Sequence, residues 1–259
     1  MKYEGPSRAV VDLDAYVRNL GVVRSFVGPR RRIIAVIKAD AYGHGAVPVA
    51  RAALRSGVCM LGVATVPEAL VLRQAGIDAP ILVMVTPHAG EFSLVVEHRL
   101  TLMVSDVATA QRLGELARDA GRIASIHCKV DTGMGRQGFS AEGAPAALQA
   151  ISRITHIDIE GIATHFSSAD VPDDPFTAGQ IKTFKHVVRE VEKLGVPFEF
   201  AHAASSAAII GYPDSLFDAV RPGLISYGVW PVPDSSPDHP PLRRVLSWET
   251  TVVQVRNLA

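Results

Sequence analysis

Short apolar runs recur along the chain and alternate with segments whose apolar positions follow the helical period. The runs are rich in β-branched residues, which is typical of strands buried on both faces of a parallel sheet. Eight of them are predicted to be strands, at residues 33–38, 58–63, 81–85, 100–104, 123–130, 157–163, 198–201 and 224–227. Amphipathic helices are predicted between most of them, at residues 15–26, 47–56, 67–75, 107–120, 144–152 and 176–194, with Asp14 capping the first.

The alternation of strands and helices predicts βαβ units and therefore an α/β fold with a parallel sheet. Eight units in 259 residues favour closure into a (β/α)8 TIM barrel, whose usual size is about 250 residues. An open dinucleotide-binding sheet is the alternative. It is disfavoured because no Gly-x-Gly-x-x-Gly sequence follows the first strand.

Two further segments show strand patterns outside this series. Residues 8–13 form a short apolar run, and residues 245–255 alternate partly with period two, as in an antiparallel strand with one solvated face. Residues 231–241 contain five prolines, which is typical of a linker. We therefore expect a barrel over residues 1–230. Residues 231–259 are expected to form a linker and the start of a truncated C-terminal β domain, whose first strand also pairs with residues 8–13.

Composition narrows the classes of partner. The 26 Lys and Arg residues balance 26 Asp and Glu residues, which argues against nucleic acid or an anionic membrane as the main partner. No signal-like or membrane-spanning apolar stretch is found, so a cytoplasmic protein is expected. Cys59 and Cys128 lie in strand-like segments without metal-ligand spacing and are expected to be buried thiols.

The candidate chemistry lies at the strand ends, where (β/α) barrels carry their functional groups. Lys38 is the only charge of its apolar run, and a glycine-rich loop follows it; a solvated strand end is the alternative. Other strand ends supply Lys129, Arg136, His165, His202, Ser205, Ser206 and Arg221. No carboxylate cluster accompanies them, so a divalent metal site is not expected. A cationic set of this kind suits a phosphorylated ligand and a substrate carboxylate.

Several polar residues near these ends have simpler interpretations. Asp40 and Asp131 are expected to fix their loops as hydrogen-bond acceptors. His44, His127 and His156 are expected to be structural or surface residues. For His202, a structural and a functional role are both left open.

Five segments are similar, in order and spacing, to the motifs of one family. The first is Ala35-Val36-Ile37-Lys38-Ala39-Asp40-Ala41-Tyr42-Gly43-His44-Gly45, which resembles the cofactor-lysine signature of alanine racemases, the fold-type III pyridoxal phosphate enzymes. Residues 129–136, 164–166, 202–208 and 220–224 resemble further motifs of that family. The resemblance covers almost the whole chain.

The resemblance implies how pyridoxal 5'-phosphate would be held. Lys38 would form the Schiff base with the cofactor aldehyde. The phosphate would be bound by Tyr42, Ser205, Ser206 and the backbone N–H groups of Gly223 and Leu224. Ser205 stands where the family usually has asparagine, and a serine still offers one hydrogen bond there.

The resemblance also assigns the polar groups around the cofactor ring. Arg221 would donate to the pyridine nitrogen, and His165 would orient Arg221. Arg136 would bond the phenolic oxygen and lie near the substrate carboxylate. Lys129 matches a lysine that some members carry as a carbamate, which would position Arg136.

The function implied is an amino-acid racemase that interconverts L- and D-alanine, a peptidoglycan precursor, by two-base proton transfer at Cα. Lys38 would be one base. The other would be a tyrosine from the C-terminal β domain of the partner subunit in a homodimer, so this chain alone is expected to be impaired. The alternative is a pyridoxal phosphate-binding module or carrier with little turnover. A related decarboxylase is a third possibility, and serine, lysine or broad substrate specificity is left open.

Overall fold

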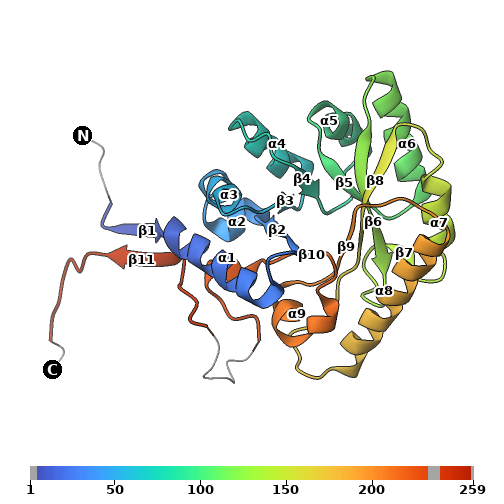
Figure 1. Ribbon diagram of the computed structural model, residues 1–259. Coiled ribbons are helices and arrows are strands. Elements are labelled where there is room, and N and C mark those ends of the chain that lie inside the picture. The colour runs from blue at the N-terminus through green and yellow to red at the C-terminus, as the bar shows by residue number, and fades with distance from the viewer. Residues whose placement is uncertain (1–4, 233–239, 258–259) are drawn as a thin grey trace.

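The computed structural model describes residues 5–232 and 240–257. Eight parallel strands close into a barrel in the order β5-β4-β3-β2-β10-β9-β8-β6, and β5 pairs with β6 to complete the ring (Figure 1). These strands are β2 (Arg32–Val36), β3 (Met60–Val63), β4 (Ile81–Val83), β5 (Thr101–Val104), β6 (Ala124–Asp131), β8 (Ile157–Ala163), β9 (Phe200–His202) and β10 (Ala219–Val220). The predicted (β/α)8 barrel is confirmed.

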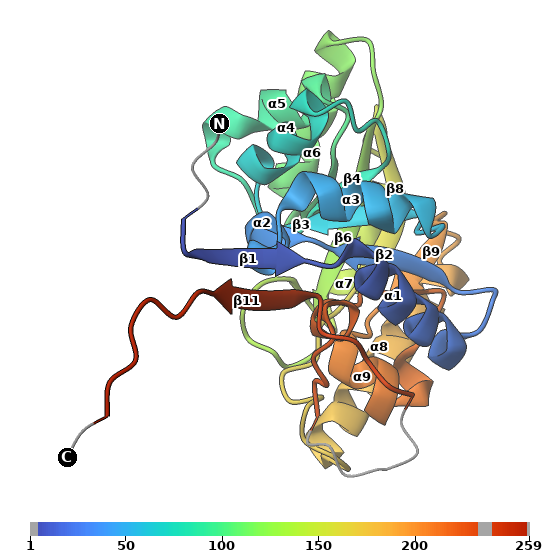
Figure 2. The same cartoon turned by 90° about the vertical axis from the view of Figure 1, so that its left-hand side faces the viewer.

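Helices surround the barrel and pack their apolar faces against its strands (Figures 1 and 2). All six predicted helices are found with bounds shifted by at most two residues. The helices are α1 (Leu13–Val27), α2 (Lys38–Gly43), α3 (Ala46–Arg55), α4 (Val66–Gln74), α5 (Phe92–Glu97), α6 (Val107–Asp119), α7 (Ala144–Ile151), α8 (Pro175–Lys193) and α9 (Ser206–Gly211). The short elements are β7 (Phe139–Ser140) and the 3₁₀ turns η1 (Ala89–Glu91), η2 (Pro213–Ser215) and η3 (Leu224–Tyr227).

The first helix starts earlier than predicted. Its N-cap is Asp12 and not Asp14, because the Asp12 carboxylate accepts a hydrogen bond from the backbone N–H of Ala15 at 2.8 Å. Asp14 lies in the first turn, where a negative charge interacts favourably with the helix dipole.

The predicted eighth strand was wrong. Residues 224–227 form η3, and the barrel position between β9 and β2 is filled by Ala219 and Val220. Residues 225–227 of this run are buried because η3 packs against α1, where the Asn19 side chain donates to the carbonyl of Ser226 at 3.1 Å. Arg221 therefore follows the eighth strand, and its side chain belongs to the C-terminal end of the barrel.

Two strands lie apart from the barrel. Strand β1 (Ser7–Val11) pairs antiparallel with β11 (Leu246–Thr250), with Ser7 opposite Thr250. Figure 1 shows this two-stranded ribbon projecting away from the barrel at the start of α1. The predicted pairing of the two ends is confirmed. Residues 233–239 of the predicted linker lie outside the described residues, and the start of a second β domain stays a prediction.

The inside of the barrel is filled by a second apolar cluster, separate from the layer between strands and helices. Ile34, Met60, Leu82, Met103 and Phe200 are its larger members. Within the described ranges, no helix is both long enough and apolar enough to cross a membrane.

Candidate active site

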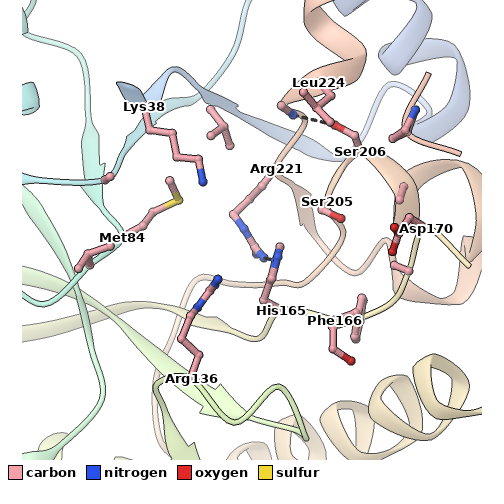
Figure 3. A pocket seen from close by; sticks show the side chains of 18 of the residues that line it. Lys38, Met84, Arg136, His165, Phe166, Asp170, Ser205, Ser206, Arg221 and Leu224 are labelled. Carbon is pink, nitrogen blue, oxygen red and sulfur yellow. Dashed lines mark hydrogen bonds between the residues drawn. The ribbon is translucent and has the colours of Figure 1, made fainter. Parts of the chain in front are cut away.

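A cavity of about 640 Å³ opens at the C-terminal ends of the barrel strands. Every residue predicted for the site lines it: Lys38, Tyr42, Lys129, Arg136, His165, Ser205, Ser206, Arg221, Gly223 and Leu224. In Figure 3 the side chains of Lys38, Arg136 and Arg221 point toward one another across this space, although their strands are far apart in sequence. The barrel therefore brings the predicted residues together.

Lys38 is followed by an unusual backbone. The four residues from Ala39 to Tyr42 all have φ between 51° and 54°, so they form a turn of left-handed helix without a glycine. Each such residue costs roughly 1–2 kcal/mol relative to the right-handed form. The sequence predicted only a glycine-rich loop here, and this conformation was missed.

Hydrogen bonds to carboxylates compensate for this strain. Glu68 bridges two backbone N–H groups, accepting from Ala39 at 3.0 Å and from Ala64 at 2.7 Å. Asp40 accepts from the N–H of Ala46 at 2.6 Å, which confirms its predicted loop-fixing role. Glu68 therefore ties the turn that presents Lys38 to the end of the neighbouring strand.

Tyr42 is supported by other aromatic rings. Its ring centroid lies 5.0 Å from that of Tyr227, which in turn lies 5.3 Å from that of Tyr16. Burial raises the pKa of Tyr42, so its hydroxyl remains a hydrogen-bond donor at neutral pH. A Cβ atom at position 223 would lie 2.7 Å from this hydroxyl, so only glycine leaves it room.

Arg221 is buried and held by neutral acceptors. Its NH1 group donates to Nδ1 of His202 at 2.7 Å and to the carbonyl of His202 at 3.1 Å. Its NH2 group donates to the carbonyls of Thr164 and Ala203 at 2.7 and 2.8 Å, and lies 3.3 Å from Nδ1 of His165. Burial and then the nearby charge of Arg136 lower the pKa of Arg221 to about 10, so it stays protonated at neutral pH. Its Nε has no acceptor within the described part of the chain.

Lys129 is a buried amine beside other cations. Its relative exposure is 4%, and burial, then the charges of Arg221 and Arg136, hold its pKa well below the ordinary lysine value. Asp131 is the nearest negative charge, but its carboxylate accepts hydrogen bonds from the N–H groups of Gly133 and Gly135, which confirms its predicted loop-fixing role. The Lys129 amine is therefore biased toward its neutral form.

The wall opposite the cations carries hydroxyl and backbone groups (Figure 3). Ser206 Oγ accepts from the N–H of Gly223 at 2.9 Å and from that of Ile225 at 3.3 Å, so the Gly223 N–H predicted to hold phosphate is already bonded. This pairing directs the hydroxyl proton of Ser206 away from those two groups. Within the described ranges the N–H of Leu224 has no acceptor, and the Ser205 side chain caps no helix amide.

The family follows from comparison with known proteins. The family model "Alanine racemase, N-terminal domain" matches residues 11–231. The chain belongs to the alanine racemase family. It is 42% identical to the alanine racemase of Desulforamulus reducens over 227 aligned residues. The aligned region covers 87% of this chain and 61% of that protein. It is 37% identical over 254 residues to the alanine racemase of Methanococcus maripaludis, covering 98% of this chain and 68% of that protein.

Solved alanine racemases have the same fold. The enzyme of Clostridium difficile 630 in complex with cycloserine superposes with a TM-score of 0.94 at 33% identity, covering 99% of this chain and 71% of that chain. The enzyme of Streptomyces coelicolor A3(2) gives 0.87 at 36% identity, covering 94% and 66%. The chain spans about two thirds of the length of the curated relatives it matches.

The charge of this alanine racemase-family cavity is positive. Arg136 and Arg221 line it together with Lys38, and Asp170 is the one carboxylate among its described lining residues. Burial, reinforced first by Arg221, lowers the pKa of His165 to about 2, so this imidazole is neutral and can accept a hydrogen bond. The site can therefore bind a ligand with two anionic groups, and it offers a lysine amine at the surface of the cavity.

Sequence reasoning missed two polar residues that support the site without lining the cavity. Glu68 was not singled out, and His127 was taken as structural although it contacts the histidine that Arg221 binds. Polar residues within otherwise apolar strands were the available signal. His127 interrupts the run at 123–130 and Glu160 the run at 157–163.

Proposed function

We propose that this chain is the cofactor-binding barrel of a pyridoxal 5'-phosphate-dependent racemase that interconverts L- and D-alanine. The observation that carries the proposal is the convergence of Lys38, Arg136 and Arg221 on one cavity at the strand ends of an alanine racemase-family barrel. The names of the relatives support alanine as substrate, and the geometry of the barrel itself does not select alanine over serine or lysine.

The residues fit the cofactor. A phosphate would lie against the Tyr42 hydroxyl, Ser205, Ser206 and the N–H of Leu224, a cradle that requires glycine at position 223. Lys38 would hold the aldehyde end. When bound, pyridoxal phosphate supplies a carbonyl that condenses with amines and a ring that withdraws electrons from the substrate Cα.

Arg221 would face the ring nitrogen with Nε, the guanidinium nitrogen left without an acceptor in the described structure. An arginine only donates and gives up its proton with difficulty, so the ring nitrogen would stay unprotonated. His165 lies within reach of Arg221 and would orient it. These contacts would hold the ring in one orientation and moderate its pull on electrons.

Arg136 would bind the substrate carboxylate and the phenolic oxygen of the cofactor. The neutral amine of Lys129 can add carbon dioxide, forming an N–C bond and releasing one proton, and the resulting carbamate would give Arg136 a negative partner. That modification would also reduce the excess of positive charge around the cavity.

Lys38 would move a proton on one face of the substrate Cα. Of the two lysines that line the cavity, Lys38 is exposed and Lys129 is buried. Tyr42 is the single tyrosine among the described lining residues, and it lies at the phosphate end. The opposing base is proposed to be a tyrosine of the partner subunit in a homodimer. The second candidate function follows from the same observation, because a cavity in which no base opposes Lys38 would bind the cofactor with little turnover.

Two measurements separate these functions. The purified chain is mixed with pyridoxal phosphate, its visible absorbance is recorded, and L-alanine is added while D-alanine is assayed. Cofactor absorbance with D-alanine formation supports the racemase, and absorbance without D-alanine supports the binding module. If the chain binds no cofactor, both proposals fail.

A further inference from the structure

A chain of four buried or half-buried side chains runs through the inside of the barrel, away from the cavity. Arg221 NH1 lies 2.7 Å from Nδ1 of His202, and Nε2 of His202 lies 2.8 Å from Nδ1 of His127. Nε2 of His127 then lies 3.4 Å from Oε2 of Glu160. We call His202, His127 and Glu160 the imidazole chain. It joins strands β9, β6 and β8 beneath the cavity.

The direction of hydrogen bonding in this chain is fixed by its first member. A guanidinium only donates, so Nδ1 of His202 must accept and its proton must lie on Nε2. That proton is donated to Nδ1 of His127, which places the His127 proton on Nε2, facing Glu160. Both histidines are therefore neutral Nε2–H tautomers. Nε2 of His127 makes no hydrogen bond of good geometry in the described part of the chain, and the group it faces is the Glu160 carboxylate at 3.4 Å, so we take that carboxylate as its partner.

The barrel is built to accommodate this chain. Both imidazoles are fully buried among apolar side chains such as Phe200, where apolar residues would cost less. A Cβ atom at position 161 would lie 3.0 Å from three atoms of the His127 ring, so glycine at 161 makes room for it. Thr101 Oγ1 donates to Glu160 at 3.2 Å, which holds the carboxylate end in place.

The imidazole chain also stabilises the buried positive charge of Arg221. Among the described residues no carboxylate contacts the buried Arg221, and a buried cation is costly unless its surroundings compensate. The aligned imidazoles present a lone pair to the guanidinium and end on an anion. Although burial alone would raise it, the pKa of Glu160 is lowered, first by its contact with His127, so the carboxylate remains charged.

We propose that Glu160, His127 and His202 are positioning residues that hold the NH1 edge of Arg221 and thereby direct its Nε into the cavity. The link to catalysis rests on the proposed function, in which Arg221 faces the cofactor ring. The imidazole chain forms in the folded protein without cofactor, so its hydrogen bonding can be tested in the cofactor-free protein.

The first test determines the histidine tautomers by ¹⁵N-edited NMR on the cofactor-free chain. His202 and His127 should each show a protonated Nε2 and an unprotonated Nδ1, assigned by the loss of signals in H127Q and H202Q. An imidazolium, or a proton on Nδ1 of either ring, would overturn the proposal. In E160Q the Nε2 proton of His127 should shift, while E115Q should leave it unchanged. Glu115 is the matched control because it is exposed and pairs with Arg112 on the surface of α6.

The second test measures cofactor affinity by absorbance in H127L and H127Q, which differ in hydrogen bonding at similar volume. H127L should weaken binding of pyridoxal phosphate about tenfold, the equivalent of one positioning hydrogen bond. H127Q should recover part of that loss, because an amide can both accept and donate. If wild type, H127L and E160Q bind pyridoxal phosphate with equal affinity, the imidazole chain only fills space in the barrel and the proposal is contradicted. Failure of the proposed function is distinguishable: wild type and E115Q would both lack cofactor absorbance while the tautomer pattern stayed intact.

Discussion

Replacing Glu68 by glutamine tests how the protein holds its reactive lysine. The Glu68 carboxylate accepts from the N–H groups of Ala39 and Ala64 with different oxygens. In E68Q one of those oxygens becomes an NH₂ group, which would face a second donor. A hydrogen bond to a charged group contributes about 1.5–3 kcal/mol, and Glu68 is partly exposed, so we take the lower end. The expected loss is about 1.5 kcal/mol, concentrated in the left-handed turn after Lys38.

This loss should appear in three measurements. Amide exchange at Ala39 should be about tenfold faster, since 1.4 kcal/mol corresponds to a factor of ten. The melting temperature should fall by about 3–6 °C. The reaction of Lys38 with pyridoxal phosphate, followed by absorbance, should slow or weaken because the turn no longer fixes the lysine.

The matched control is E91Q. Glu91 accepts a single hydrogen bond, from the N–H of His88 at 2.9 Å, in a turn away from Lys38, and a glutamine oxygen can keep that bond. E91Q should therefore leave Ala39 exchange and the Lys38 reaction unchanged. If E68Q behaves like E91Q in both, Glu68 does not hold the turn and the reasoning is refuted.

Three further changes have defined outcomes. G223A places a Cβ atom 2.7 Å from the Tyr42 hydroxyl, so binding of both inorganic phosphate and pyridoxal phosphate should weaken, and unchanged calorimetric affinities would contradict the proposed cradle. The wild-type chain given ¹³C-bicarbonate should show a carbamate carbonyl signal that K129M lacks; a signal in both would place the carbamate elsewhere. Because burial lowers the pKa of His165 to about 2, unfolding takes up a proton below pH 6.5. The contribution of His165 to stability is complete above that pH and should fall on acidification by about 1.4 kcal/mol per pH unit, with His127 and His202, whose pKa values burial also lowers, adding to the total slope. Urea titrations of H165Q should show a slope that is shallower by about the His165 contribution.

Much of the fold could be predicted because the buried strands and helices differ in apolar period. Seven of the eight barrel strands were placed correctly, since runs such as 123–130 are long and continuous. The eighth was missed because Ala219 and Val220 are too few to give a pattern. The longer run at 224–227 buries its last three residues against a helix and not in the barrel sheet. A short apolar run shows burial, but it does not show against what.

The candidate site, like the fold, could be predicted only in part. Residues that the motifs carry, such as Lys38 and Arg221, could be named from the sequence, and closure of the barrel brings them together. The left-handed turn could not be predicted, because alanine, aspartate and tyrosine do not favour positive φ and the conformation depends on Glu68. The imidazole chain could not be predicted either. Its partners come from three strands, and their pairing depends on register within the closed barrel.

The central claim is that Lys38 holds pyridoxal phosphate at the end of strand β2. The most direct measurement is borohydride reduction of the chain after incubation with pyridoxal phosphate, followed by peptide mass spectrometry. The account predicts one modified lysine, Lys38, carrying the reduced cofactor, and no such product in K38A. Modification at Lys129 or at surface lysines with Lys38 unmodified would contradict it.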